Sequence, residues 1–180
     1  GSTSTLFPMT MANCGRKFTV ASQPQRIVSL NQGTTEILLS LGLAKQMVGT
    51  ATWTDPVLPS LAGENAQVRR LADNNASFET VIAQRPDLVT ASFANTLSDS
   101  GSGSYEKFGQ LKVPAYMSFV ECQKAAFKSG SSDGRRSTPV TMADIDHDIT
   151  DIAALTGTQK EGQVQNAPLP TPCLLSLQPP

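Results

Sequence analysis

QRIVSLNQGTTEILLSL, residues 25–41, carries the clearest structural pattern in this chain. Its first six residues form a short β-branched run after Pro24 and predict a strand over 25–30. A Thr cap and apolar residues at helical spacing follow, and Gly42 ends the run, so the second part predicts a helix. A strand, a loop and a helix in succession form the repeating unit of α/β proteins.

The alternation of strands and helices continues on both sides of this unit. Ser77 caps one helix, Arg85-Pro86 ends it, and Gly157 stops the last helix. This order predicts an α/β fold, a Rossmann-like sandwich built on a parallel sheet of roughly four or five strands. Further strands are expected at 16–20, 45–50, 68–71, 87–92 and 114–119, further helices at 77–83, 105–111 and 141–155, and a polar, basic excursion at 123–137.

Composition restricts the class of protein. A length of 180 residues suits one core, and 39% hydrophobic with 16% charged residues is typical of a globular chain, not a disordered one. The 14 Lys and Arg nearly balance the 15 Asp and Glu, so a net charge of −1 offers no footprint for nucleic acid. No run approaches the roughly 20 apolar residues of a membrane-spanning helix. We therefore expect no nucleic-acid partner.

The three cysteines, Cys14, Cys122 and Cys173, fit neither a zinc site with paired spacing nor a CxxC redox motif. The simplest arrangement is one disulfide and one remaining thiol. Cys14 and Cys122 both lie just outside expected strands, whereas Cys173 lies in a Pro-rich segment. We therefore predict a disulfide between Cys14 and Cys122, which implies an oxidising compartment.

Motifs of catalysis are weak in this chain. His147, the single histidine, lies among aspartates in the last expected helix, and only Asp144 is expected to share its face. One histidine and one carboxylate do not make a metal site, and every Ser-His-Asp triad would need the same histidine. GxGxxG and P-loop motifs do not occur. We predict no metal, no cofactor and no catalytic residue, and keep a small Rossmann-like enzyme as the lowest alternative.

Two motifs resemble those of a known family. PQRIVSL at 24–30, followed by Leu41-Gly42 and Val48-Gly49, is similar to an opening pattern of P-x-R-[IV]-V-x-L, a helix ending in LG, and then VG. FETVIAQRPDLV at 78–89 resembles a second signature, in which a helix runs into PDLV. Over about residues 14–157 the chain resembles the extracytoplasmic solute-binding proteins of iron-siderophore and vitamin B12 ABC transporters.

This resemblance implies one lobe of a two-lobe, class III binding protein, whose lobes are joined by a long helix and hold the ligand between them. The chain would be the amino-terminal lobe, periplasmic or tethered to the cell envelope. It would bind an iron-siderophore, haem or a corrinoid for delivery to an ABC permease. Glu79 resembles the acidic residue that docks on permease arginines, although a first-turn glutamate also suits an ordinary helix-stabilising role.

The same resemblance divides the chain into segments. Residues 14–140 are expected to form the ligand-binding lobe, and residues 141–157 the start of the interlobe helix. Residues 1–13 would combine Gly1-Ser2, typical of a tag-cleavage remnant, with an amino-terminal extension, since no signal peptide is visible. Residues 158–180 do not resemble the family, and their prolines predict an extended or disordered tail.

Candidate ligand contacts follow the strands, because open parallel sheets bind ligands beyond the carboxyl ends of their strands. The residues after the first strand lie at a helix amino terminus, whose free N–H groups suit an anionic ligand group, with plain capping as the alternative. Trp53 offers an aromatic face, with core packing as the alternative. For the others a solvated turn is the alternative. The candidates are Asn31, Gln32, Gly33, Thr34, Trp53, Thr54, Asn74, Asn75, Ser92, Phe93, Asn95 and Ser118.

A lobe without its partner has a second interpretation. The apolar surface that the second lobe would cover would be exposed, and exposed apolar surface favours association. In this interpretation the truncated lobe no longer binds ligand and forms a homo-oligomer through its exposed face. The dependence of molecular size on concentration separates this alternative from a monomeric binding protein.

Overall fold

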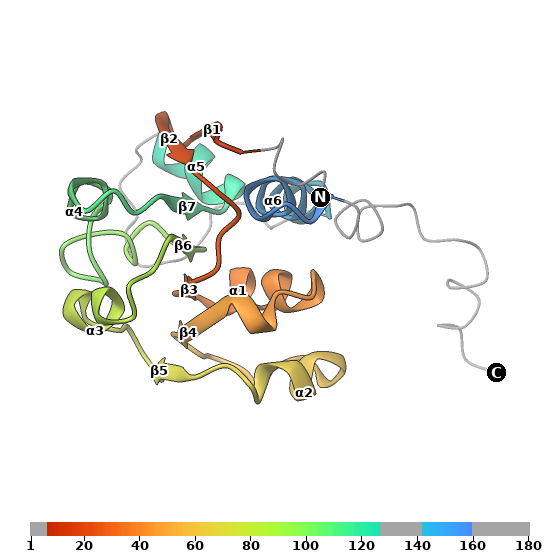
Figure 1. Cartoon of the computed structure of the whole chain (residues 1–180). Coiled ribbons are helices and arrows are strands. Elements are labelled where there is room, and N and C mark those ends of the chain that lie inside the picture. The colour runs from red at the N-terminus through yellow and green to blue at the C-terminus, as the bar shows by residue number, and fades with distance from the viewer. Residues whose placement is uncertain (1–6, 127–141, 160–180) are drawn as a thin grey trace.

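The computed structural model describes residues 7–126 and 142–159, and a parallel five-stranded sheet lies at its centre (Figure 1). The strands are β3 (Ile27–Ser29), β4 (Met47–Ala51), β5 (Arg70–Ala72), β6 (Leu88–Ala91) and β7 (Ala115–Met117). Their order across the sheet is β5-β4-β3-β6-β7, and all neighbouring pairs are parallel. The predicted Rossmann-like α/β fold with a parallel sheet is confirmed.

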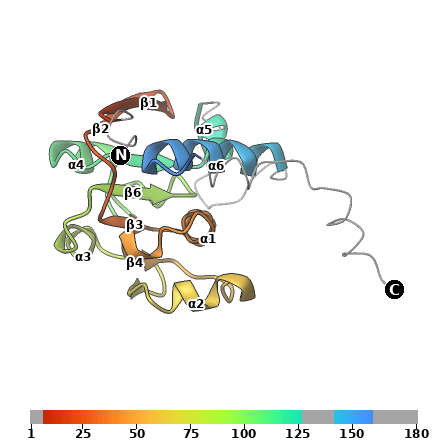
Figure 2. The same ribbon diagram turned by 45° about the vertical axis from the view of Figure 1, so that its right-hand side comes forward.

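Helices cover both faces of the sheet (Figures 1 and 2). One face packs against α1 (Gln32–Ser40) and α6 (Met142–Thr156), and the other against α3 (Phe78–Ala83) and α4 (Tyr105–Gln110). The shorter elements are the 3-10 helices η2 (Ala44–Gln46) and η3 (Pro59–Leu61) and the helices α2 (Ala62–Asn65) and α5 (Phe119–Ala126).

Each strand contributes side chains to the cores on both faces of the sheet, because successive side chains alternate between the two faces. On β3, Ile27 packs in the core formed with α1 and α6, and Val28 packs in the core formed with α3 and α4. On β6, Leu88 and Val89 repeat this alternation in register with Ile27 and Val28. All four side chains are fully buried, as expected of a parallel sheet that is covered on both faces.

A hairpin of β1 (Met9–Asn13) and β2 (Arg16–Val20) lies against the edge strand β7. The side-chain amide of Asn13 donates to the carbonyl oxygen of Met117 (2.9 Å) and accepts from its N–H (2.8 Å), much as a neighbouring strand would. The next residue, Cys14, forms a disulfide bond with Cys122 of α5. The sequence predicts β2 but not β1, which lies in the segment expected to be an amino-terminal extension. The β1 sequence, MTMAN, has few strand-forming residues and so gives little sign of a strand.

Helix α5 lies where the sequence predicted two other features. These were a strand continuing to Phe119 and a polar excursion beginning at residue 123. The strand β7 ends at Met117 because the carbonyl oxygen of Ser118 accepts the N–H groups of Glu121 and Cys122, which starts a helical turn. The rest of the excursion, residues 127–137, lies outside the described residues. The segment from residue 160 onward, including Cys173, also lies outside them.

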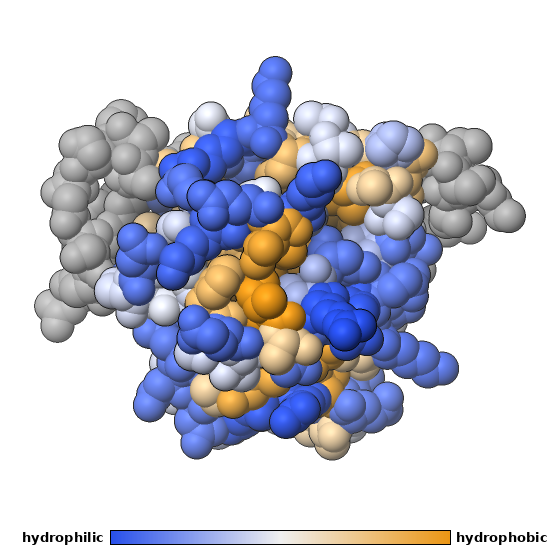
Figure 3. Space-filling model, turned by 60° about the vertical axis from the view of Figure 1, so that its left-hand side comes forward, coloured by the Kyte–Doolittle hydropathy of each residue, from blue (hydrophilic) through white to orange (hydrophobic). Residues whose placement is uncertain are grey.

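The α3 and α4 side of the molecule is mostly hydrophilic (Figure 3). A smaller group of apolar residues lies near the middle of this view. Leu111, directly after α4, is 51% exposed. Among the described helices, none has both the length and the apolar character needed to cross a membrane.

Candidate functional site

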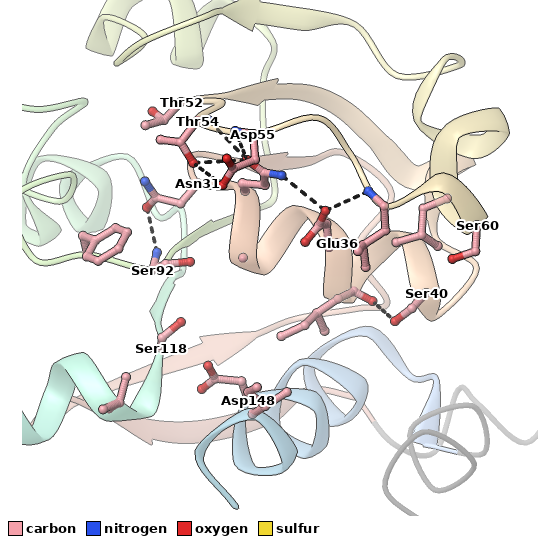
Figure 4. Close-up of a pocket in the computed structure, with 18 residues that line it drawn as sticks. Asn31, Glu36, Ser40, Thr52, Thr54, Asp55, Ser60, Ser92, Ser118 and Asp148 are labelled. Atoms are coloured by element: carbon pink, nitrogen blue, oxygen red, sulfur yellow. Dashed lines mark hydrogen bonds between the residues drawn. The ribbon is translucent and has the colours of Figure 1, made fainter. Parts of the chain in front are cut away.

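A groove of about 810 Å³ lies where β3, β4, β6 and β7 end (Figure 4). Helix α1 and the segment after β4 line one side, and α6 with the start of α5 lines the other. The segment after each of these four strands contributes to the lining, with Gly33, Thr54, Ser92 and Ser118 as examples. This is the carboxyl edge of the sheet, at which open parallel sheets bind ligands.

The structure brings seven of the twelve candidate contacts together in this groove. These are Asn31, Gln32, Gly33, Thr54, Ser92, Phe93 and Ser118. The other five, Thr34, Trp53, Asn74, Asn75 and Asn95, are not among the described lining residues.

Asn31 holds two of the groove segments together instead of capping α1. Its side chain makes no capping hydrogen bond to the helix, although it occupies the N-cap position. Its Oδ1 accepts from the N–H of Ser92 (2.7 Å), and its Nδ2 donates to Oγ1 of Thr96 (3.2 Å). The first-turn N–H groups of α1 are therefore not capped by this side chain and point toward the groove end of the helix. Gly33 lines the groove in that first turn.

A row of hydroxyl groups on the sheet positions the two helices that line the groove. Ser29, Thr90 and Tyr116 lie in register on neighbouring strands, and all three are fully buried. The Ser29 hydroxyl is 2.8 Å from that of Thr34 on α1, and the Thr90 hydroxyl donates to Thr34 (3.0 Å). The Tyr116 hydroxyl donates to Asp148 on α6 (3.0 Å). Buried hydroxyls need such partners, so these contacts fix how α1 and α6 sit on the sheet. Thr34 is thus a packing residue and does not face the groove.

Trp53 is also held away from the groove. Its Nε1 donates to Oγ1 of Thr50 (3.1 Å), and the guanidinium of Arg70 lies 4.8 Å from its ring centroid. The asparagines that follow β5 shape the adjacent turn, because the N–H of Thr52 donates to the carbonyl oxygen of Asn74 (3.1 Å). These residues follow strands, as the prediction required, but they are not among the lining residues of the groove. Asn75 is exposed in the same turn, and Asn95 is exposed in the turn after β6.

The groove contains residues that the sequence did not indicate. Three are carboxylates, namely Glu36, Asp55 and Asp148. Glu36 could have been found, because it lies four residues after Gln32 on the same face of α1. Asp148 could not, since only tertiary packing brings α6 to this edge. The apolar lining residues are Ile37, Leu58, Leu61, Phe93, Val120 and Ile145.

Gln32 connects α1 to the segment after β4. Its Oε1 accepts from the N–H groups of Thr54 (3.2 Å) and Asp55 (3.0 Å). Its Nε2 donates to Glu36 (3.3 Å) and to the carbonyl oxygen of Pro56 (3.2 Å). These bonds order one side of the groove before any ligand binds, which lowers the entropy cost of binding.

Asp148 lies at the base of the opposite side, next to Ser118 (Figure 4). Burial raises the pKa of its carboxyl group above the ordinary value, and the neighbouring Asp151 raises it further. Hydrogen bonds from the N–H of Phe119 (2.7 Å) and from Tyr116 oppose this shift. Burial and the two aspartates also raise the pKa of the Tyr116 hydroxyl, which keeps it protonated as a donor.

Asp148→Asn is expected to change how stability depends on pH. A carboxyl whose pKa is higher in the folded state binds its proton more tightly there, so its contribution is complete below the unfolded pKa of about 4 and is lost as pH rises through the folded pKa. Asparagine keeps an acceptor for Phe119 and has no charge to desolvate. At neutral pH the free energy of unfolding of the variant should equal that of the original chain or exceed it by about 1 kcal/mol. Urea midpoints from pH 4 to pH 8 test this, and parallel profiles for the two proteins would contradict it.

His147 lies beside an aspartate and an aromatic ring. Its Nε2 lies 3.1 Å from Oδ2 of Asp151, and its ring stacks on Phe119 with centroids 3.8 Å apart. The expectation that only Asp144 shares its face is wrong, because Asp151, at i+4, also lies there. In the part of the chain that the structure describes, no group of three metal-binding side chains occurs.

Glu79 is exposed in the first turn of α3. This helix packs on the sheet face opposite α1 and α6. Ser77 caps the helix by accepting from the N–H of Thr80 (3.1 Å), as predicted. Glu79 is therefore available to a partner that approaches the α3 side and is separate from the groove.

Comparison with known proteins identifies the family. The periplasmic binding protein family matches residues 27–167, which include the whole five-stranded sheet and α6. The match thus covers ten residues beyond Gly157, within the segment assigned to the tail. The ABC transporter substrate-binding lipoprotein YvrC of Bacillus subtilis is 30% identical over 157 residues, which are 82% of this chain and 47% of that protein.

Solved structures share the fold. A periplasmic binding protein from Veillonella parvula has a TM-score of 0.70 at 24% identity, covering 87% of this chain and 48% of that one. A structure of an ABC-type Fe3+-hydroxamate transport system from Saccharomonospora viridis has a TM-score of 0.65 at 21% identity, covering 88% and 51%. The chain spans about half the length of the relatives that it matches.

The matched family consists of extracytoplasmic solute-binding proteins and not of enzymes. Both the localisation and the class of protein expected from the sequence agree with this match. Because the family match covers well over half of its residues, the chain belongs to the periplasmic binding protein family.

Proposed function

We propose that this chain is the amino-terminal ligand-binding lobe of a solute-binding protein for an iron-siderophore, haem or a corrinoid. In its two-lobe form the protein would deliver this ligand to an ABC importer. The observation that carries the proposal is the groove, which gathers segments following four parallel strands between α1 and α6. The name of one relative, an ABC transporter substrate-binding lipoprotein, supports the transport role, and that of another, an Fe3+-hydroxamate transport system, supports an iron chelate as the ligand.

The proposal assigns a role to each part of the lobe. Residues 14–140 would form the ligand-binding lobe, and α6 would begin the helix that leads to a second lobe. The uncapped first turn of α1 would donate N–H groups to an oxygen of the ligand. The apolar lining residues would pack against its hydrocarbon surface. Glu79, on the opposite side of the sheet, would dock on the permease without contacting the ligand.

Equilibrium dialysis against four coloured compounds tests the proposal. These are a ferric tris-hydroxamate, a ferric tris-catecholate, haem and cobalamin. We expect one of them to bind saturably with one molecule per chain and a dissociation constant between micromolar and millimolar, or about 4–8 kcal/mol. Failure of all four to bind at millimolar concentration would contradict the proposed function.

The alternative of a self-associating lobe has one supporting observation. Leu58 and Ile145 line the groove and are 51% and 37% exposed, so it contains two of the three exposed large apolar side chains among the described residues. Sedimentation velocity over a wide concentration range separates the two interpretations. A constant monomer supports the binding lobe, whereas growth of a dimer together with absent ligand binding supports self-association.

A further inference from the structure

The charge of the groove is one-sided. Glu36, Asp55 and Asp148 all line it, and the lining residues that the structure describes include no lysine, arginine or histidine. The carboxylates come from three separate places, namely α1, the segment after β4, and α6. A ligand in this groove would therefore have acidic groups on both sides of it.

Among the described residues, no cationic side chain pairs with these carboxylates. Among the ion pairs between described residues, none includes Glu36, Asp55 or Asp148. The donors to Glu36 in the described part of the chain are neutral, namely the Nε2 of Gln32 (3.3 Å) and the N–H of Leu58 (3.1 Å). Asp55 is exposed, and its carboxylate accepts from the hydroxyl of Thr54 (3.4 Å). Hydrogen bonds to neutral groups orient a carboxylate but leave its negative charge in place.

The positive features of the groove are weaker. The amino terminus of α1 is equivalent to about half of an elementary charge, and it acts only near the first turn of the helix. The combined negative charge of two exposed or half-exposed carboxylates, Glu36 and Asp55, is larger than this partial positive charge. Burial reduces the ionised fraction of Asp148 by raising its pKa, so this residue adds less charge but supplies an acceptor beside Ser118.

We infer that the groove selects a ligand that is neutral or positively charged overall, with hydrogen-bond donors and an apolar surface, and that it disfavours polyanions. This inference rests on the proposed function and narrows its ligand class. A neutral or cationic hydroxamate chelate and an amide-bearing corrinoid satisfy it. A tris-catecholate chelate and haem, with its two carboxylates, do not, because their negative charges would face those of the groove.

Isothermal titration of the chain with two iron chelates of opposite charge tests the inference. The probes are ferric ferrioxamine B, which is a cation, and ferric enterobactin, which is a polyanion. We expect the cation to bind at least about tenfold more tightly than the polyanion at low salt, and the ratio of the two affinities to shrink in about 1 M salt.

Asp55→Asn should weaken binding of the cation by roughly threefold to tenfold. The matched variant Asp99→Asn removes the same charge from an exposed position outside the groove lining and should leave the affinity unchanged.

The outcomes separate this inference from the proposed function. Tighter binding of ferric enterobactin than of ferric ferrioxamine B would overturn the charge selection and would support the proposed function. Equal losses in Asp55→Asn and Asp99→Asn would overturn the assignment of the effect to the groove. If neither chelate, nor haem, nor cobalamin binds, the proposed function fails, and the inference that rests on it fails too.

Discussion

Replacing Cys14 and Cys122 together by serine is expected to lower the free energy of unfolding by about 3–5 kcal/mol. The disulfide joins residues 108 positions apart, so its loss frees a long loop of the unfolded chain. In the folded state it holds the hairpin against α5, next to the two hydrogen bonds between Asn13 and Met117. Urea denaturation followed by the fluorescence of Trp53 measures the change.

Cys173→Ser is the matched control for this experiment. It removes the cysteine that the predicted pairing leaves over, so we expect the urea midpoint to stay unchanged. Peptide mapping without reduction provides an independent test, because the peptides containing Cys14 and Cys122 should be linked. Equal urea midpoints for the double variant and the original chain, or two free thiols at these positions, would contradict the account.

Gly33→Trp is expected to reduce ligand binding in the groove by about thirtyfold or more. Gly33 lines the groove in the first turn of α1, and a Cβ atom there would lie 2.9 Å from Oγ of Ser92. Ser92 must therefore shift, and the indole must extend into the groove. Glycine in a helix costs roughly 0.5–1 kcal/mol relative to alanine, and replacing it removes part of this cost, so the fold should tolerate the change. Equilibrium dialysis with cobalamin and ferric ferrioxamine B measures the loss.

Gly109→Trp provides the control, because Gly109 lies in α4 on the opposite side of the sheet. A Cβ atom there meets no heavy atom within 4 Å. This variant adds the same side chain to a helix without entering the groove, so its affinity should match that of the original chain. A similar affinity in Gly33→Trp would show that the ligand binds elsewhere.

The sheet could be predicted because its pattern is local. Residues 25–30 and 87–92 are short apolar runs next to turn-forming residues, and each contains a strand of the structure. The strand β1 and the helix α5 were harder, because tertiary contacts stabilise them. Asn13 is held by Met117, and the end of β7 is fixed partly by Asp148, which binds the N–H of Phe119 from another helix. Sequence periodicity does not contain such contacts.

The groove was predictable only in part for the same reason. The rule that ligands bind beyond the carboxyl ends of strands identified the four converging segments. It gives no side-chain directions, so it included Trp53, whose indole donates to Thr50. It also omits elements that reach the edge by packing, such as Asp148 and Ile145 on α6. The acidic character of the groove follows from the structure and not from the nearly neutral composition.

The most direct test of the groove as the ligand site is a map of amide chemical shifts in the ¹⁵N-labelled chain, titrated with the diamagnetic gallium(III) complex of ferrioxamine B. The account predicts saturable shifts for the amides of Gly33, Ser92 and Ser118, which come from three separate segments and meet in the groove. Gly109 and Glu79, on the opposite side of the sheet, should not shift. Shifts confined to α3 and α4, or their absence throughout the chain with both this complex and cobalamin at millimolar concentration, would contradict the central claim.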